Sequence, residues 1–125
     1  MLRKESLSNS GRFLPLVLAL FILLLLPAAA RSLDVPRLEG YVNDYAGMIS
    51  PSVRSGLEQE LAAFERSDST QIVVLTVPSL EGDTIEDFGI RVAEAWKIGQ
   101  KGKDNGAIFI VSKADRKMRI EVGRG

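Results

Sequence analysis

An uninterrupted apolar run near the amino terminus divides this chain into two parts of different character. The run covers residues 13–26 (FLPLVLALFILLLL), follows a segment that holds Arg3, Lys4 and Arg12, and ends at Pro27 before three alanines. A basic segment, a short apolar run and small residues at a cleavage site are typical of a secretory signal peptide. We therefore interpret residues 1–30 as a signal peptide and residues 31–125 as the folded domain.

The alternative for residues 1–30 is an uncleaved N-terminal membrane anchor. Its apolar run of 14 residues is shorter than the stretch of about 20 apolar residues that a transmembrane helix needs. Both interpretations place the domain outside the cytoplasm. We therefore expect an extracytoplasmic protein that is periplasmic, secreted or tethered to a membrane.

The amino-acid composition excludes several classes of chemistry. The sequence contains no cysteine and no histidine, which removes thiolate and histidine-ligated metal sites and every catalytic triad that depends on histidine. Residues 31–125 hold 13 of the 16 basic and 15 of the 16 acidic residues, a net charge of −2. This balance gives no electrostatic footprint for nucleic acid, which we do not expect as a partner.

Two helices are predicted in residues 31–125. The first starts at Ser50 and Pro51, which suit the N-cap and the first helical position, and it ends near residues 67–69. Its apolar residues recur on one face: Val53, Leu57, Leu61 and Phe64. The second helix starts at Thr84 with the pattern of a capping box, and Gly99 is expected to end it. Its expected buried face consists of Ile85, Phe88, Val92, Ala95 and Trp96.

The strands are predicted from shorter apolar patterns. Residues 71–77 (QIVVLTV) and 106–111 (GAIFIV) are nearly continuous apolar runs, which is typical of strands covered on both faces. Residues 118–122 (MRIEV) alternate, which favours a half-exposed strand in a hairpin. A further short strand is expected at residues 41–42. Helices that alternate with buried strands favour a parallel or mixed sheet with helices packed on it.

Three motifs make this sequence resemble a known family. They are VNDYAG around Asp44, AWKIGQKGKDNG over residues 95–106, and IEVGRG over residues 120–125. With these motifs the chain resembles the TPM domain family, which joins thylakoid-lumen and nematode proteins with many bacterial membrane-associated relatives. The resemblance implies a three-layer α/β/α sandwich with a small mixed sheet. Because family members usually continue past the last motif, we expect the domain to be incomplete at its C-terminus.

The resemblance also implies, for some members, a bound divalent cation that is usually calcium. Calcium takes oxygen ligands from carboxylates and amides. The residues of these types in and beside the motifs are the predicted metal ligands: Asp44, Asp104, Asn105 and Glu121. A structural alternative stands beside each of them, because Asp and Asn also form turns, and Glu121 could pair with Arg119 or Lys117 on its strand. No organic cofactor is expected.

Two functions follow from this resemblance. The first is a divalent-cation-binding module without catalytic activity, which acts at or near a membrane protein or membrane-associated complex. The second is a metal-dependent, acid-phosphatase-like hydrolase of phosphate monoesters, in which the cation would polarise a phosphoryl oxygen and activate water. The sequence favours the first, because no nucleophile stands in a recognisable catalytic motif. No catalytic residue is predicted, and whether the protein is an enzyme stays open at the level of sequence.

Overall fold

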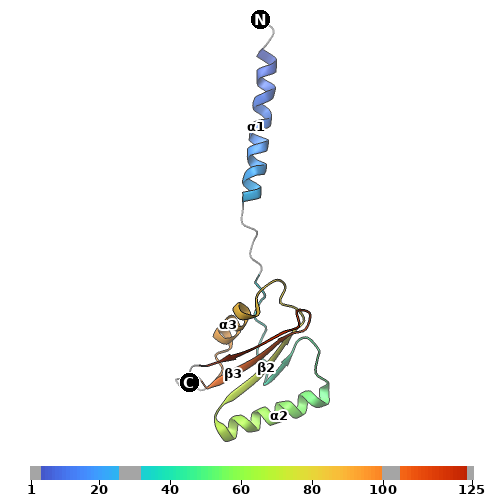
Figure 1. Cartoon of the computed structure of the whole chain (residues 1–125), viewed down its shortest axis with the longest axis vertical. Coiled ribbons are helices and arrows are strands. Elements are labelled where there is room, and N and C mark those ends of the chain that lie inside the picture. Colours follow the sequence, from blue (N-terminus) through green and yellow to red (C-terminus); the bar gives the residue numbers. More distant parts are fainter. Residues whose placement is uncertain (1–3, 26–31, 100–104, 124–125) are drawn as a thin grey trace. The chain divides into compact units, whose positions relative to one another are not determined.

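A computed structural model describes residues 4–25, 32–99 and 105–123 of the chain (Figure 1). The chain divides into two units, Met1–Ala30 and Arg31–Gly125. The first unit contains helix α1 (Lys4–Leu25), in which residues 14–24 are exposed. None of the described helices combines the length and the apolar character that crossing a membrane requires.

The second unit is built on a four-stranded mixed sheet with the strand order β1-β2-β3-β4. The strands are β1 (Val42–Asp44), β2 (Gln71–Val77), β3 (Gly106–Ser112) and β4 (Lys117–Val122). The first three run parallel to one another, and β4 returns antiparallel to β3. The mixed sheet expected from the sequence is confirmed, with β1 starting one residue later than predicted.

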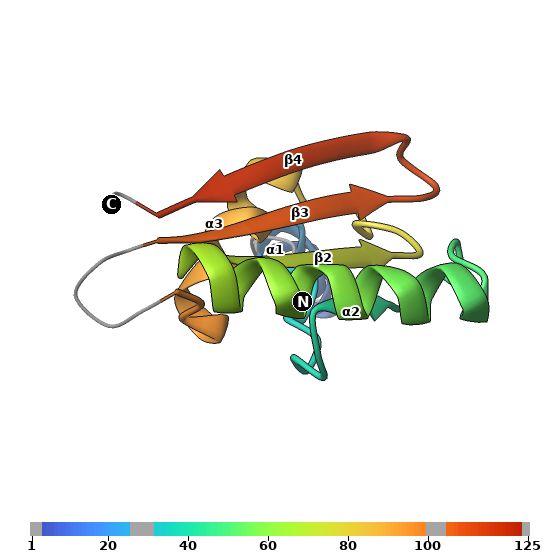
Figure 2. The same cartoon turned by 90° about the horizontal axis from the view of Figure 1, so that it is seen from below.

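Two helices lie on opposite faces of this sheet. Helix α2 (Pro51–Asp68) packs on β1 and β2, and helix α3 (Ile85–Trp96) packs on β3 and β4. Figure 2 shows α2 in front of the sheet and α3 behind it. The expected α/β/α arrangement of layers is therefore confirmed.

The two helical connections of the sheet have opposite hands. The strands β1, β2 and β3 are parallel neighbours in chain order, so both connections advance across the sheet in the same direction. Two such connections of the same hand would place both helices on one face, whereas α2 and α3 lie on opposite faces. One connection is therefore left-handed, which is rare among parallel crossovers.

The hydrophobic core lies between the sheet and α3. It is built from β2, β3, α3 and the turn before α3: Val73, Leu75, Val77, Leu80, Ile85, Phe88, Val92, Ile108 and Ile110. Ala95, predicted to be buried, is exposed, and Ala93 packs against the core in its place. Trp96 is half-buried, and its indole N–H donates to the carbonyl of Pro36 at 2.9 Å.

The predicted helix starts are confirmed by their caps. The Ser50 hydroxyl accepts from the Val53 N–H at 3.4 Å, and the Thr84 hydroxyl accepts from the Asp87 N–H at 3.1 Å. The prediction that Gly99 ends α3 is wrong, because the C-cap is Lys97, whose φ of 47° is left-handed. The helix ends where its buried face ends, and Gly99 supplies a second left-handed residue in the following loop.

Helix α2 covers only half of its face of the sheet. No residue of α2 is fully buried, and among the described residues the strands that α2 approaches most closely are β1 and β2. On β3 the residues under α3 are buried, whereas Ala107, Phe109 and Val111 on the other face are only half-buried. The prediction that residues 106–111 are covered on both faces is therefore wrong.

Gly106 is a position where backbone atoms leave no room for a side chain. A Cβ atom there would lie 2.7 Å from the carbonyl oxygen of Ile98 and 2.9 Å from the amide nitrogen of Gly99. Because these backbone atoms cannot rotate away, we expect Gly106→Ala to lower the free energy of unfolding by about 1–3 kcal/mol, as overpacking does elsewhere. Urea unfolding followed by circular dichroism measures this loss.

Gly56 in α2 provides the matched control. No atom outside the local helix backbone lies within 4 Å of a Cβ atom placed there. Alanine is favoured over glycine inside helices, so Gly56→Ala should raise stability by about 0.5–1 kcal/mol. A Gly106→Ala variant as stable as the parent would contradict the close approach of residues 98–99 to Gly106.

Candidate functional site

Asp44 ends β1 and lies directly opposite Thr76 of β2. Its Oδ1 accepts from the Thr76 hydroxyl at 2.6 Å and from the Met48 N–H at 2.9 Å, and its Oδ2 accepts from the Ile49 N–H at 2.9 Å. The carboxyl ends of parallel strands are where open α/β sheets usually bind ligands. Here the carboxylate instead holds the loop that joins β1 to α2.

The pKa of Asp44 reflects these contacts. Burial raises the pKa of this carboxyl, while the hydrogen bonds from Thr76, Met48 and Ile49, together with the charge of Arg54, lower it. The net pKa lies below the ordinary value of 3.8. Asp44 is therefore a carboxylate at neutral pH, stabilised by donors of its own chain.

Asn43, the neighbouring residue of the VNDYAG motif, is also used by the backbone. Its Oδ1 accepts from the N–H groups of Glu39 and Gly40 at 2.8 and 3.2 Å. Its Nδ2 donates to the carbonyls of Gly40 and Val74 at 3.0 and 3.1 Å. The buried amide thus fixes the turn that enters β1, while Asp44 fixes the loop that leaves it.

Asn105 lies at the other end of the sheet from Asp44. It immediately precedes Gly106, which pairs with Gln71 at the start of β2, whereas Asp44 pairs with Thr76. Five residues of strand separate these two positions, which is about 17 Å at 3.3 Å per residue. The Asn105 amide donates to the carbonyl of Ser69. Asp44 and Asn105 are therefore not brought together.

Glu121 lies on the α3 side of β4, opposite Ile108. Its carboxylate pairs with Arg119, and its side chain is 16% exposed. It packs over α3 so closely that a Cβ atom on Gly89 would lie 2.7 Å from its Oε1. Glu121 thus pairs with Arg119, as the structural alternative predicted, but it lies against α3 and does not face solvent as that alternative assumed.

The structure does not bring the described members of the predicted metal set together at one place. The Asp44 carboxylate accepts hydrogen bonds from its own loop, at the carboxyl end of β1. Asn105 and Glu121 lie toward the opposite end of the sheet. Within residues 4–25, 32–99 and 105–123, no group of three or more acidic residues is placed to hold a metal ion. Asp104 lies outside the described residues, so a calcium site at this residue stays a prediction.

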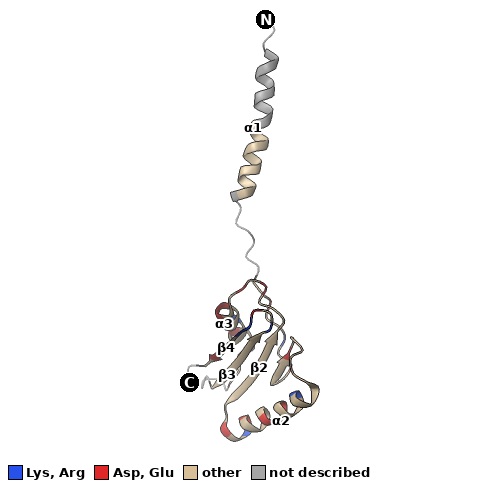
Figure 3. Cartoon of the chain, turned by 45° about the vertical axis from the view of Figure 1, so that its right-hand side comes forward, with Lys and Arg blue, Asp and Glu red and all other residues tan. Residues whose placement is uncertain are grey.

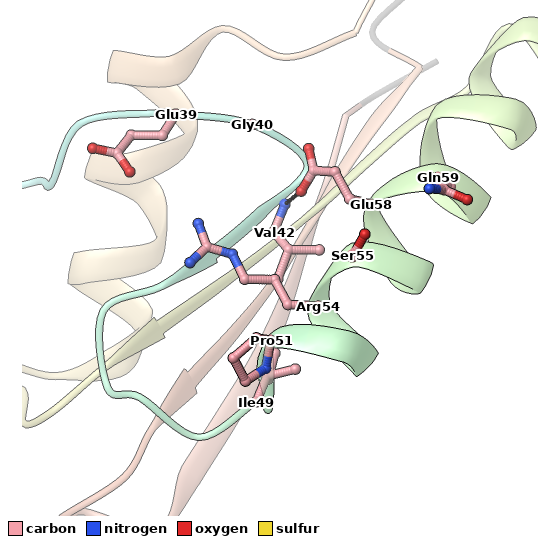
Figure 4. A pocket seen from close by; sticks show the side chains of 9 residues that line it. All are labelled: Glu39, Gly40, Val42, Ile49, Pro51, Arg54, Ser55, Glu58 and Gln59. Atoms are coloured by element: carbon pink, nitrogen blue, oxygen red, sulfur yellow. Dashed lines mark hydrogen bonds between the residues drawn. The ribbon is translucent and has the colours of Figure 1, made fainter.

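A cleft of about 530 Å³ opens beside β1, next to the Asp44 loop (Figure 4). Its lining comes from the turn before β1, the loop after it and the first turns of α2: Glu39, Gly40, Val42, Ile49, Pro51, Arg54, Ser55, Glu58 and Gln59. In Figure 4 the Arg54 side chain extends past Val42. The charged groups of the lining are the guanidinium of Arg54 and the carboxylates of Glu39 and Glu58.

Glu58 is the residue of this cleft that sequence analysis missed. Its Oε1 accepts from the Tyr41 N–H at 2.6 Å, and its Oε2 accepts from the Val42 N–H at 2.8 Å. A glutamate on a helix with other charges is ordinarily solvent-exposed, so no pattern in the sequence signals this role. The carboxylate joins α2 to the edge strand of the sheet.

Replacing Asp44 with asparagine should destabilise the domain. An amide nitrogen cannot accept a hydrogen bond from the loop N–H that it would face, so we expect a loss of about 1–3 kcal/mol in the free energy of unfolding at neutral pH. Asp34→Asn, a change at an exposed aspartate, is the control and should shift stability by less than about 0.5 kcal/mol. Equal stability of the two variants would show that Asp44 does not hold the loop.

The same carboxylate should make stability depend on pH. Because the folded pKa of Asp44 lies below the ordinary value of 3.8, its contribution is complete above about pH 4 and is lost as pH falls through the folded pKa. Urea midpoints measured from about pH 6 down to about pH 2 should therefore fall less in Asp44→Asn than in the parent. Parallel curves would contradict this role.

A calcium titration separates Asp44 from Asp104. Calcium that binds the folded state raises the melting temperature. We expect any such rise in melting temperature to persist in Asp44→Asn, because the Asp44 carboxylate accepts hydrogen bonds from its own loop. The rise should disappear in Asp104→Asn. A rise that disappears in Asp44→Asn alone would place the ion at the end of β1 and overturn this assignment.

Comparison with known proteins identifies the family. A search of curated proteins found no match. Among solved structures, the chain is similar to the N-terminal domain of a protein from P. gingivalis, determined by solution NMR, with a TM-score of 0.61 and 29% identity. That match covers 66% of this chain and 53% of the other, so the chain spans about half the length of that relative. The sequence matches the TPM domain over residues 42–125, and the chain therefore belongs to the TPM domain family.

Proposed function

We propose that this TPM domain is a non-catalytic binding module that docks onto a membrane protein complex outside the cytoplasm. The observation that carries the proposal is an apolar surface on the α2 side of the sheet, half-buried on β3 and exposed on β4 among the described residues, which we call the open apolar face. It consists of alternate side chains of β3 and β4: Phe109, Val111, Met118, Ile120 and Val122.

The β4 side chains of this face are largely exposed to solvent. Met118 is 68%, Ile120 60% and Val122 67% exposed. In the strand register Met118 lies opposite Val111, and Ile120 lies opposite Phe109, so the side chains form two adjacent rows. A contiguous exposed apolar patch on a domain of this size is typical of an interaction site.

The distribution of charge supports docking through the sheet. The strands β2 and β3 contain no charged residue, whereas acidic and basic residues are frequent on α2 and α3 (Figure 3). Figure 2 shows β3 and β4 lying clear of α2 on this side. A partner that contacts this side of β3 therefore meets no charge on that strand.

The apolar run at residues 13–26 and the basic residues before it support the extracytoplasmic placement in this proposal. Docking through the open apolar face requires no divalent cation, so calcium binding at Asp104 is a separate prediction. Phosphate-ester hydrolysis is the alternative function. It is less favoured because Asp44, the carboxylate at the carboxyl end of β1, is engaged by its own loop.

Ile120→Lys should weaken docking without unfolding the domain. Ile120 is 60% exposed, so a lysine there costs the free domain little, whereas at an interface it would leave an unpaired charge buried. We expect comigration of the whole chain with a membrane protein complex on native gels to fall at least about tenfold. Ile90→Lys on α3, at a site 47% exposed, is the matched control and should comigrate normally.

Two results would count against this function. Normal comigration of Ile120→Lys, or an equal loss in Ile90→Lys, would mean that the open apolar face is not the docking surface. Divalent-cation-dependent hydrolysis of a phosphate monoester by the purified chain would favour the phosphatase-like alternative.

A further inference from the structure

The segment that leads into β1 is attached to the domain differently from every strand and helix. Residues 32–38, which we call the strap, have no regular secondary structure, and within the described part of the chain no main-chain hydrogen bond joins them to a strand or a helix. We infer that the strap is releasable: it leaves the domain as a unit while the sheet stays folded, and it thereby lengthens the chain before β1. This inference does not depend on the open apolar face.

Three side chains hold the strap by its carbonyl groups. Arg91 of α3 donates to the Leu33 carbonyl at 2.6 Å. Trp96, at the end of the same helix, donates to the Pro36 carbonyl at 2.9 Å. The Tyr45 hydroxyl donates to the next carbonyl along the strap. The strap is thus attached at three separate points, and none of the three donors belongs to a strand.

The strap buries little apolar surface. Of its side chains, Leu33 and Val35 pack against the core, and both are only half-buried. An open cavity of about 340 Å³ lies between the strap and the loop that follows β2, which lines it through Pro78 and Glu81. Because this cavity separates the strap from the loop, few close contacts hold the two together.

Release of the strap leaves no donor buried without a partner. Arg91 and Trp96 are half-buried and Tyr45 is 39% exposed, so once the strap leaves, their donor groups face the water that replaces it. Arg91 also keeps its ion pair with Asp83, just before α3. Exchanging a hydrogen bond within the protein for one to water changes the free energy only slightly. Each of the three attachments is therefore weak.

The same reasoning determines where release stops. The N–H groups of residues 39 and 40 donate to the Asn43 amide oxygen at 2.8 and 3.2 Å. Asn43 is 1% exposed, so freeing these residues would leave a buried acceptor without its donors, which is costly. The N–H groups of residues 41 and 42 donate to the Glu58 carboxylate. The strap therefore ends at Leu38, and β1 keeps its place when the strap is released.

Release changes how far the folded domain reaches from the residues that precede the strap. In the docked state, the Leu33 carbonyl is fixed to α3 through Arg91. After release, the seven residues 32–38 form a linker. At up to about 3.6 Å per residue, this linker spans as much as about 25 Å. The strap is therefore a connection with two lengths, short when docked and long when released.

Thiol labelling of the whole chain tests this inference, because the sequence contains no cysteine of its own. One chain carries Val35→Cys on the strap, and another carries Val73→Cys in the core, at a site 1% exposed. Local release predicts that Val35→Cys is labelled at least about a hundredfold faster than Val73→Cys. Its rate should hardly change with urea below the unfolding transition, since release exposes little surface. A urea dependence as steep as that of Val73→Cys would mean that the strap leaves only when the domain unfolds.

A matched pair of tyrosine substitutions separates release from labelling of the docked strap. Tyr45→Phe removes a hydroxyl that donates to the strap, whereas Tyr41→Phe removes one that donates to Glu65 of α2. We expect labelling of Val35→Cys to accelerate about fivefold in Tyr45→Phe, which loses one attachment, and to stay unchanged in Tyr41→Phe. Equal rates in the two variants would overturn the inference, because labelling would then not require release.

The distance between two spin labels tests the lengthened connection. The labels are attached to cysteines that replace Ser32 on the strap and Glu94 on α3, both of which are exposed. With Tyr45→Phe and Trp96→Phe combined, two of the three attachments are lost, and we expect a longer and broader distance component. The Tyr41→Phe chain should show the short distance alone. One narrow distance in both chains would contradict release of the strap as a unit.

Discussion

Two hydrogen bonds from the edge strand to the carboxylate of Glu58 determine where α2 lies on the sheet. They hold α2 over β1 and β2, although no residue of the helix is fully buried. Gly40 permits this contact, because a Cβ atom there would lie 2.6 Å from Glu58 Oε1. The half-covered sheet, the cleft beside β1 and the open apolar face all follow from this attachment.

The acidic and amide residues around β1 accept hydrogen bonds from the backbone. Asn43 accepts from N–H groups of the turn before β1, and Asp44 accepts from N–H groups of the loop after it. Glu58 accepts from the Val42 N–H on the outer edge of β1. β1 has only three residues and therefore forms few backbone hydrogen bonds with β2. Side-chain acceptors supply the hydrogen bonds that this short edge strand cannot form with a neighbouring strand. The motif VNDYAG thus has a structural explanation that is independent of catalysis or metal binding.

Local features were predictable from the sequence, and features that depend on distant contacts were not. The caps at Ser50 and Thr84 and the strand at residues 71–77 depend on neighbouring residues, and they are confirmed. The half-buried state of Phe109 depends on which strands α2 covers. The apolar run at residues 106–111 contains no information about that helix. Likewise, Asp44 and Asn105 are both next to strand ends, but only the parallel register shows that the ends are opposite ones.

The close approach of Gly99 to Gly106 has a consequence for the tolerance of this chain to insertions. A Cβ atom on Gly99 would lie 2.8 Å from the amide nitrogen of Gly106, and the Gly99 N–H donates to Gln71 at 2.7 Å. The connection between α3 and β3 thus leaves and returns at nearly the same point in space. Because closing a longer loop between fixed, adjacent ends costs little additional entropy, a few residues inserted between Gly99 and Gly106 would leave the register of the sheet unchanged.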